Sequence, residues 1–200
     1  MGSRIKAMKR IWREICVCQK CDIAKYVRNR VFGDGETKSK IVLVGEAPGM
    51  DEDKSGHPFV GNAGQILRKC LLAAGIKPKD IFICNVLKCH PPKELDPPSG
   101  NRKPSKKEIE NCLPFLKQQL DIIKPEVVVA MGRVAAEALL GPMVKDEKMM
   151  DLVGLTWDLT GVDYQIAVCY HPQYLGYRSY DVGLERDYID FFKRIKDGEI

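Results

Sequence analysis

Four apolar runs alternate with helical patterns along the chain, and this order constrains the fold more than any other feature. The runs cover residues 41–44, 81–87, 127–130 and 165–169. Continuous apolar strands separated by helices are typical of a parallel sheet that is buried on both faces. We therefore expect an α/β fold: a single three-layer α/β/α domain over residues 1–200, with a central, mainly parallel four-stranded sheet.

The patterns between the runs predict the remaining elements. Apolar residues recur at helical spacing in residues 4–17, 62–74, 105–120 and 184–195. Ser105 and Glu108 have the spacing of a capping box at the start of the third of these helices. Residues 156–168 indicate a hairpin that turns around residues 160–163. Residues 91–104 form a long loop rich in proline, lysine, serine and glycine, and such loops are usually functional or disordered.

The first apolar run leads directly into the sequence GEAPG at residues 45–49. Its glycines and proline indicate a tight turn in which backbone amides can approach a ligand closely. An acidic loop follows at residues 51–53, and the segment containing Phe59 then opens the next helix. The loop carries too much negative charge for a phosphate and lacks the lysine of a P-loop, so a phosphate cradle is excluded.

Polar residues stand at the ends of three different apolar runs. Glu46, Asn85 and His171 each follow the point where a strand should end. The carboxyl ends of parallel strands meet at one edge of a sheet, and open α/β sheets bind their ligands there. The sequence therefore predicts a site that combines a carboxylate, an amide and an imidazole.

Charge and hydropathy narrow the class of protein. The formal net charge of +5 is compatible with nucleic-acid binding without being diagnostic of it. No segment approaches the roughly 20 apolar residues of a membrane span, and the N-terminal segment has no apolar core of a signal peptide. We expect a cytoplasmic protein without a membrane partner.

Eight cysteines are many for a protein of that compartment, where disulfides are disfavoured. Cys70, Cys84 and Cys169 lie on apolar elements and are expected to be buried hydrophobes. Five others remain: Cys16, Cys18, Cys21, Cys89 and Cys112. Cys18-x-x-Cys21 has the spacing of a pair of metal ligands, and Cys16 is one position out of that register. Spacing alone leaves an iron–sulfur cluster, zinc and free thiols open.

Taken together, these motifs resemble the family-four uracil-DNA glycosylases, the iron–sulfur branch of that superfamily. The resemblance covers residues 18 to about 178. It rests on GEAPG, on the sequence GHPFVG at residues 56–61, on NVLKCHPP at residues 85–92, and on His171-Pro172 with the cysteines. It implies a monofunctional hydrolase that removes uracil from damaged DNA in base excision repair. The implied partner is uracil-containing DNA, single- or double-stranded, and the implied state is a monomer.

The resemblance also implies a cofactor and a set of uracil-binding residues. The family holds a 4Fe–4S cluster, and the matching ligands here are Cys18, Cys21, Cys89 and Cys112. The matching uracil-binding residues are Glu46, Ala47, Pro48, Glu52, Phe59, Asn85 and His171. The role implied for the cluster is mainly structural.

Each implied role fits the chemistry of its residue. Phe59 is the stacking platform for a flipped-out uracil, unless it is a core phenylalanine. Asn85 donates to uracil O4 and accepts from N3–H, a pattern that rejects cytosine. His171 donates to the oxyanion that develops at uracil O2, unless it only caps a helix before Pro172.

The remaining roles concern water and DNA. Ala47 cannot activate water, so backbone groups together with Glu46 or Glu52 position the water. Alternatively, Glu52 fills the space of a thymine methyl group. Leu175 resembles a wedge that enters the minor groove, and Arg178 resembles a phosphate contact.

Two other functions stay open at this point. One is a uracil-DNA-binding protein that traps its product covalently. In a sister branch that behaviour depends on an arginine-rich loop with a histidine, and residues 93–103 contain no histidine. The other is an iron–sulfur redox or scaffold protein without catalysis.

Overall fold

The computed structural model describes residues 2–95, 97–178 and 181–200. Its main sheet has six strands in the order β1-β3-β2-β6-β8-β7, and β4 pairs with β5 in a separate hairpin. The strands are β1 (Asp34–Gly35), β2 (Ile41–Gly45), β3 (Ile81–Asn85), β4 (Glu94–Leu95), β5 (Pro98–Ser99), β6 (Val127–Met131), β7 (Thr156–Asp158) and β8 (Gln165–Cys169). The four central strands β3, β2, β6 and β8 are parallel, as predicted.

The expectation of four strands was wrong in number, because a short antiparallel strand borders the sheet on each side. β1 pairs with β3 through two residues, and β7 pairs with β8 as the first arm of the predicted hairpin. A two-residue strand such as β1 has no periodicity of its own. Its pairing with β3 is a tertiary event, which the local sequence does not encode.

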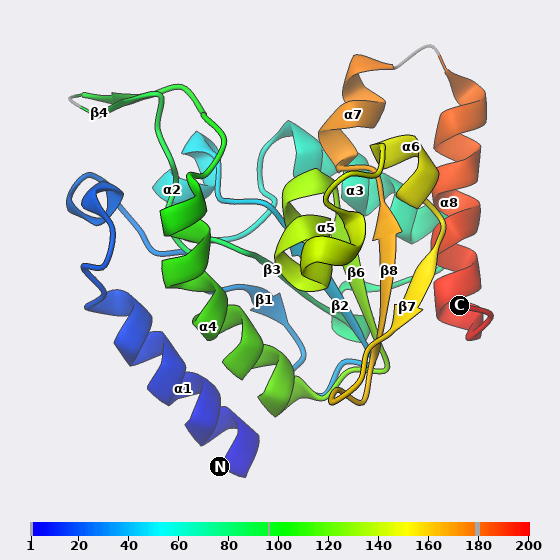
Figure 1. Cartoon of the computed structure of the whole chain (residues 1–200), viewed down its shortest axis with the longest axis horizontal. Helices are drawn as coiled ribbons and strands as arrows, with labels where there is room; N and C mark the ends of the chain where they lie inside the picture. Colours follow the sequence, from blue (N-terminus) through cyan, green and yellow to red (C-terminus); the bar gives the residue numbers. More distant parts are fainter. Residues whose placement is uncertain (1, 96, 179–180) are drawn as a thin grey trace.

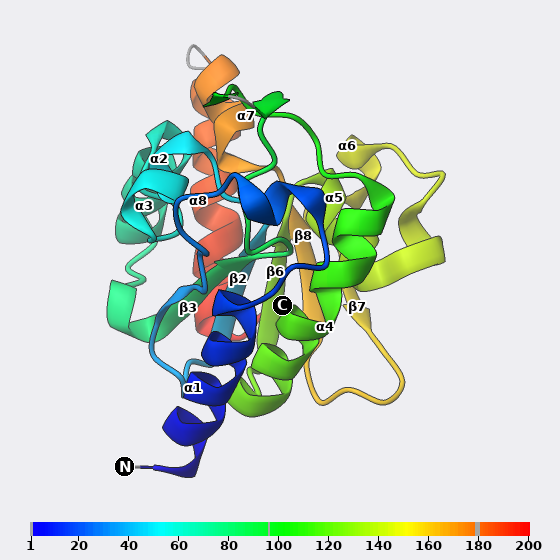
Figure 2. The ribbon, with the colours of Figure 1, turned by 90° about the vertical axis from the view of Figure 1, so that its left-hand side faces the viewer.

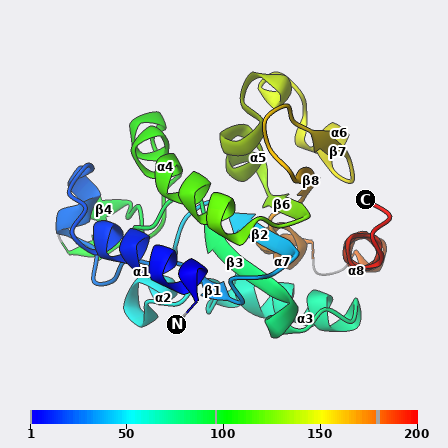
Figure 3. The ribbon, with the colours of Figure 1, turned by 90° about the horizontal axis from the view of Figure 1, so that it is seen from below.

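Helices cover both faces of the sheet, which confirms the three layers (Figure 3). One face carries α1 (Ser3–Cys16), α4 (Lys106–Ile123) and α5 (Arg133–Leu140). The other carries α3 (Asn62–Ala73) and α8 (Val182–Asp197). The shorter helices are α2 (Met50–Ser55), α6 (Met149–Leu152), α7 (Pro172–Tyr177) and the 3-10 turns at Asp22–Lys25, Pro78–Asp80 and Gly141–Val144.

Alternate residues of each strand divide the core into two halves. In β2, Val42 and Val44 pack with the cluster under α1 and α4, whereas Ile41 and Leu43 pack with the cluster under α3 and α8. All five β2 residues are buried. Burial on both faces explains why these strands are continuous apolar runs rather than alternating ones.

The parallel strands bring their carboxyl ends to one edge, where the predicted polar residues lie. β3 ends at Asn85 rather than at residue 87, because the Val86 and Leu87 amides leave the ladder and donate to the Gly45 and Glu46 carbonyls. α2 and α7 gather at the same edge (Figures 1 and 2). α2 also replaces part of the acidic loop that the sequence predicts after residue 49.

The β4–β5 hairpin projects from the body at this end of the molecule (Figure 1). Among the described residues, no helix is long and apolar enough to cross a membrane.

Candidate active site

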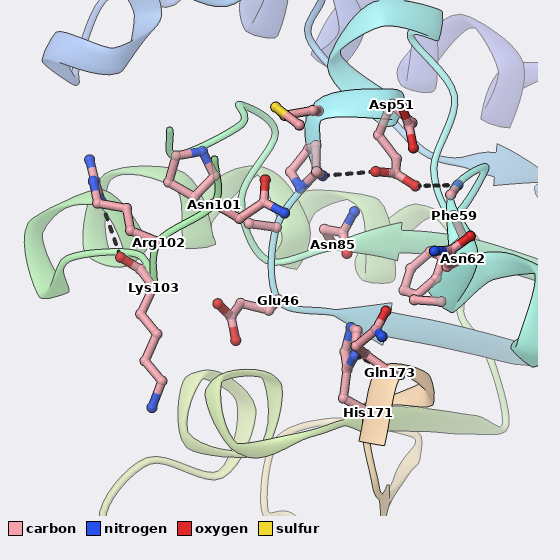
Figure 4. A pocket seen from close by; sticks show the side chains of 18 of the residues that line it. Glu46, Asp51, Phe59, Asn62, Asn85, Asn101, Arg102, Lys103, His171 and Gln173 are labelled. Atoms are coloured by element: carbon pink, nitrogen blue, oxygen red, sulfur yellow. Dashed lines mark hydrogen bonds between the residues drawn. The ribbon is translucent and has the colours of Figure 1, made fainter. Parts of the chain in front are cut away.

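A pocket of about 630 Å³ opens at the carboxyl edge of the sheet (Figure 4). Three chain segments supply its central polar groups: the β2–α2 turn, the end of β3 and the start of α7. All seven residues that the resemblance implies for uracil binding line it: Glu46, Ala47, Pro48, Glu52, Phe59, Asn85 and His171. The seven residues predicted from the sequence therefore share one cavity.

Asn85 is the buried polar group at the centre of this pocket, with 3% of its surface exposed. Its backbone carbonyl accepts a hydrogen bond from the Lys88 ammonium at 2.7 Å. Its side-chain amide has no hydrogen-bond partner among the residues that the structure describes, so its donor and acceptor are both available. Gly45 lies so close that a Cβ there would stand 2.4 Å from Asn85 Oδ1, and glycine is required at that position.

Phe59 forms the wall beside Asn85, and its ring also packs on the core. A Cβ at Gly45 would stand 2.5 Å from this ring, so the ring lies directly over the β2 terminus. The Phe59 and His171 ring centroids are 6.1 Å apart, with the planes inclined at 31°. Phe59 is therefore a core residue that also lines the pocket, and its role as a stacking platform stays a prediction.

His171 is the N-cap of α7, and its ring is held in one orientation. The Gln173 amide donates to His171 Nδ1 at 3.2 Å, so in the neutral ring the proton is on Nε2. Burial lowers the His171 pKa to about 4, although the nearby Glu52 charge opposes that shift. The imidazole is therefore neutral at physiological pH and presents an N–H donor.

Glu46 contributes the carboxylate that faces the pocket in Figure 4. Burial raises the pKa of Glu46, and the positive charge of Lys103 partly opposes that effect. Within the described part of the chain, this carboxylate has no hydrogen-bond or ion-pair partner. It remains available to a water molecule or a substrate.

Glu52 is used differently, because both of its carboxylate oxygens accept backbone hydrogen bonds. Gly49 N–H donates to Oε2, while Val60 and Gly61 N–H donate to Oε1, all at 2.9 Å. Gly49 and Gly61 are the N-caps of α2 and α3. One side chain thus satisfies the first amides of two helices and fixes the loop between them.

The long loop at residues 91–104 supplies pocket residues that the sequence reasoning missed. His90 Nε2 lies 2.9 Å from the Gly100 carbonyl and 2.8 Å from Asn101 Oδ1. Arg102 makes a two-point ion pair with Glu108, at 2.9 and 2.8 Å. These contacts fold the loop back so that Asn101, Arg102 and Lys103 line the pocket. The one sequence feature that could have indicated this position of the loop is the capping residue Glu108, which follows a basic segment.

α7 supplies further pocket residues that were not predicted, which are Gln173, Tyr174 and Tyr177. Tyr174 stacks on Tyr170 with ring centroids 4.5 Å apart, and the Arg178 guanidinium lies 5.8 Å from the Tyr174 ring centroid. Tyr177 is 78% exposed. The rim of the pocket is therefore aromatic and carries a positive charge.

The expectation that Leu175 is an exposed wedge does not agree with its position. Leu175 is 7% exposed and belongs to the apolar cluster beneath α3 and α8. On a helix as short as α7, the side chain two residues later points elsewhere, which is why Tyr177 is exposed instead. Arg178 does not line the pocket but lies next to it.

The four cysteines selected as ligands also meet, in a second hollow. Cys18, Cys21, Cys89 and Cys112 line it together with apolar side chains and with Lys20, Glu108 and Asn111. The Lys88 amide donates to Cys112 Sγ at 3.2 Å, and Asn111 Nδ2 donates to Cys21 Sγ at 3.5 Å. Burial raises the pKa of Cys89 to about 12 and also raises that of Cys112.

The other four cysteines stay outside this hollow: Cys70, Cys84 and Cys169 are buried as predicted, and Cys16 is exposed. In the described residues, no three His, Cys, Asp or Glu side chains are arranged to hold a single metal ion. Four thiols around one hollow are nevertheless the kind of donor set that a 4Fe–4S cluster takes, and the several atoms of a cluster hold their ligands farther apart than one ion does. The donor set fits that cofactor.

Comparison with known proteins agrees with this geometry. The model of the uracil DNA glycosylase superfamily matches residues 32–194. The type-4 uracil-DNA glycosylase of Pyrobaculum aerophilum is 43% identical over 158 residues, which are 78% of this chain and 77% of that protein. The type-4 enzyme of Archaeoglobus fulgidus is 38% identical over 96% of this chain and 92% of its own length. That of Thermotoga maritima is 37% identical over 88% and 86%. The chain therefore belongs to the uracil-DNA glycosylase superfamily and, within it, to the type-4 family.

Proposed function

We propose that this protein removes uracil from DNA by hydrolysing the N-glycosidic bond of a flipped-out deoxyuridine, leaving an abasic site for base excision repair. It is a monofunctional uracil-DNA glycosylase. One observation carries the assignment of the site. The Asn85 amide and the His171 Nε2–H both lack partners among the described residues and line one pocket beside the Phe59 ring.

Asn85 and Phe59 recognise the base. A flipped base is read at its Watson–Crick edge and stacked on an aromatic ring. The Asn85 amide donates to uracil O4 and accepts from N3–H, whereas cytosine offers the opposite pattern at these two atoms. The burial of Asn85 supports this role, because an unpaired amide in a dry site strongly disfavours a ligand that cannot satisfy it.

His171 stabilises the leaving group. As the glycosidic bond breaks, negative charge develops on uracil O2, and a neutral imidazole held by the Gln173 amide donates its Nε2–H there. The lowered pKa of His171 supports a hydrogen-bond donor rather than a proton donor. The histidine caps α7 as well, so the capping role and the catalytic role use different ring nitrogens.

Glu46, rather than Glu52, positions the attacking water. The Glu46 carboxylate faces the pocket without a partner in the described chain, whereas three backbone amides already occupy the Glu52 oxygens. Glu52 acts by fixing the loop that forms one wall of the pocket, where it also limits the space beside the base. Ala47 and Pro48 line the wall between them and bring no reactive group.

The α7 rim contacts DNA. Tyr177 is the exposed aromatic side chain beside the pocket and takes the wedge position that the sequence suggested for Leu175. Arg178 and Lys103 supply positive charge on either side for the phosphates. The partner is uracil-containing DNA, single- or double-stranded.

The cofactor is a 4Fe–4S cluster held by Cys18, Cys21, Cys89 and Cys112. When bound, it supplies a covalent cross-link between the start of the chain, the end of β3 and α4. Residues 1–200 act as one domain and as a cytoplasmic monomer. The packing of α1 against α4 supports the single domain.

A gel assay tests the proposed function. The protein is incubated with a uracil-containing oligonucleotide, abasic sites are cleaved with alkali, and the products are separated. We expect cleavage at the uracil position and none with thymine in its place. Binding without cleavage would show a non-catalytic uracil-DNA-binding protein. A band that stays shifted on a denaturing gel would show covalent trapping of the product.

A further inference from the structure

Phe59 has a backbone conformation that a phenylalanine does not adopt unless its surroundings impose it. Its φ is +54°, and among the described non-glycine residues only Lys124 also has a positive φ. Lys124 ends a helix, where the left-handed conformation is common. Phe59 ends no helix and lines the pocket, and strained backbone of this kind is characteristic of functional sites.

Contacts from α3 hold this conformation. Arg68 Nη1 donates to the Phe59 carbonyl at 2.8 Å. Gly64 allows the same carbonyl to approach α3, because a Cβ at residue 64 would stand 1.6 Å from the Phe59 oxygen. The next two amides, of Val60 and Gly61, are held by Glu52. The peptide after Phe59 is therefore fixed on both sides.

From these contacts we infer that Arg68 is a positioning residue for the uracil-stacking ring. It does not line the pocket and acts by holding the Phe59 carbonyl, which sets the direction in which the ring leaves the backbone. The inference rests on the proposed function, in which Phe59 stacks on uracil. It assigns a role in base recognition to a residue of α3 that touches neither the base nor the reacting atoms.

The expected effect is on uracil recognition more than on binding to DNA in general. Without Arg68, the left-handed conformation of Phe59 loses a charge-assisted hydrogen bond, and the ring no longer faces the base before it arrives. Because the Arg68 side chain is partly in solvent, its contribution lies at the lower end of such hydrogen bonds, about tenfold in affinity for uracil-DNA.

The test compares Arg68→Ala with Lys69→Ala, which removes the same charge from the next position of α3 and breaks only a surface ion pair with Glu185. Binding is titrated with an uncleavable 2′-fluoro-deoxyuridine oligonucleotide and with undamaged DNA. Arg68→Ala should weaken binding of the uracil analogue about tenfold and leave binding of undamaged DNA equal to that of Lys69→Ala. Arg68→Lys, which keeps a donor, should recover part of the loss.

A double-mutant cycle separates this role from a direct contact with DNA. In a Phe59→Ala background, Arg68→Ala should have no further effect on binding of the uracil analogue. An equal loss in both backgrounds would overturn the inference, and so would equal losses for the uracil analogue and for undamaged DNA. If the wild-type protein cleaves uracil-DNA while the cycle is additive, the inference fails and the proposed function stands. If the wild-type protein neither cleaves nor prefers uracil-DNA, the proposed function itself fails.

Discussion

The uracil pocket and the cysteine site lie in one fold but are assembled in different ways. In the pocket, backbone hydrogen bonds already fix each functional side chain or the loop that carries it. His171 accepts from the Gln173 amide, and Glu52 accepts from the Gly49 amide of its own helix and from the Val60 and Gly61 amides of the facing loop. These groups need no ligand to reach their positions, as catalysis by preorganised groups requires.

The cysteine site draws its four thiols from separate segments, and hydrogen bonds reach only Cys21 and Cys112 Sγ among the described residues. Cys18 and Cys21 precede a short 3-10 turn, Cys89 follows β3, and Cys112 lies on α4. The surrounding apolar side chains favour the neutral thiols, as the raised pKa of Cys89 and Cys112 indicates. Binding a metal cluster here would therefore also contribute to folding, because it would cross-link three segments of the chain. The fold positions the groups of the pocket, whereas a cluster bound by the cysteines would stabilise the fold.

Asp53 connects the two regions. Its buried carboxylate accepts from the Arg28 amide at 3.0 Å and from the Asn29 amide at 3.4 Å, in the segment that follows the first cysteine pair. Asp53 belongs to α2, which also carries Glu52. Loss of order at the cysteine site can thus reach the wall of the pocket through a single helix.

The largest effects should follow from changes at the cysteine site. Cys89→Ala or Cys112→Ala should lose the brown colour expected of anaerobically purified protein and most of the soluble yield, since the cluster also supplies folding free energy. Visible absorbance, iron analysis and the soluble fraction measure these outcomes. Cys16→Ala is the control, because Cys16 is exposed and outside the hollow. A colourless, zinc-loaded and fully active preparation would contradict the assignment of the cofactor.

A change at His171 should instead leave a folded, coloured protein that reacts slowly. His171→Asn keeps a side-chain acceptor for the Gln173 amide at the N-cap but loses the Nε2–H donor, and loss of one such donor typically costs about 100- to 1000-fold in rate. The measurement is single-turnover cleavage with excess enzyme, beside binding of the 2′-fluoro-deoxyuridine analogue. If binding weakens as much as cleavage slows, His171 is not acting on the transition state.

The sequence predicts well the parts of the molecule that follow from a local pattern of residues. The four central strands are continuous apolar runs, so their identity and parallel order follow from local pattern. Glu46, Asn85 and His171 lie at or just past the ends of those strands, so their convergence follows from the parallel direction of the strands. The four cysteines come together from distant segments, and the resemblance to a family supplied that set.

The failures occur where a position depends on contacts between distant residues. The strand β1 exists only because it pairs with β3. The loop at residues 91–104 returns to the pocket through contacts of His90 and Glu108, and the capping box at Glu108 does not by itself indicate the ion pair with Arg102. The burial of Leu175 depends on how α7 packs against α3, and a motif match carries no information about that packing.

A smaller effect, on the pH dependence of the rate, should test the role of Glu46 in particular. Lys103→Ala removes the charge that partly opposes the raised pKa of Glu46. Water positioning requires the ionised carboxylate, so the rate falls as the pH drops through this pKa. Without Lys103 the pKa of Glu46 is higher, so that fall in rate begins at a higher pH. Single-turnover rates from acid to neutral pH measure the shift. Lys93→Ala, in the same loop but outside the pocket, is the control. An unmoved acid limb in Lys103→Ala would show that Glu46 does not control the rate.

The smallest effect should come from Arg178 at the α7 rim, which belongs neither to the cysteine site nor to the preorganised groups of the pocket. Arg178 lies over the Tyr174 ring beside the pocket, where a phosphate of bound DNA can reach its guanidinium. If it replaces one condensed counterion, Arg178→Ala should reduce the slope of log affinity against log salt concentration by about one unit and leave single-turnover cleavage at saturating enzyme unchanged. Arg186→Ala removes the same charge from α8, does not line the pocket and should leave the slope unchanged. An equal slope for Arg178→Ala and the wild type would remove Arg178 from the DNA interface. A slower cleavage step would instead place it with the preorganised groups of the pocket.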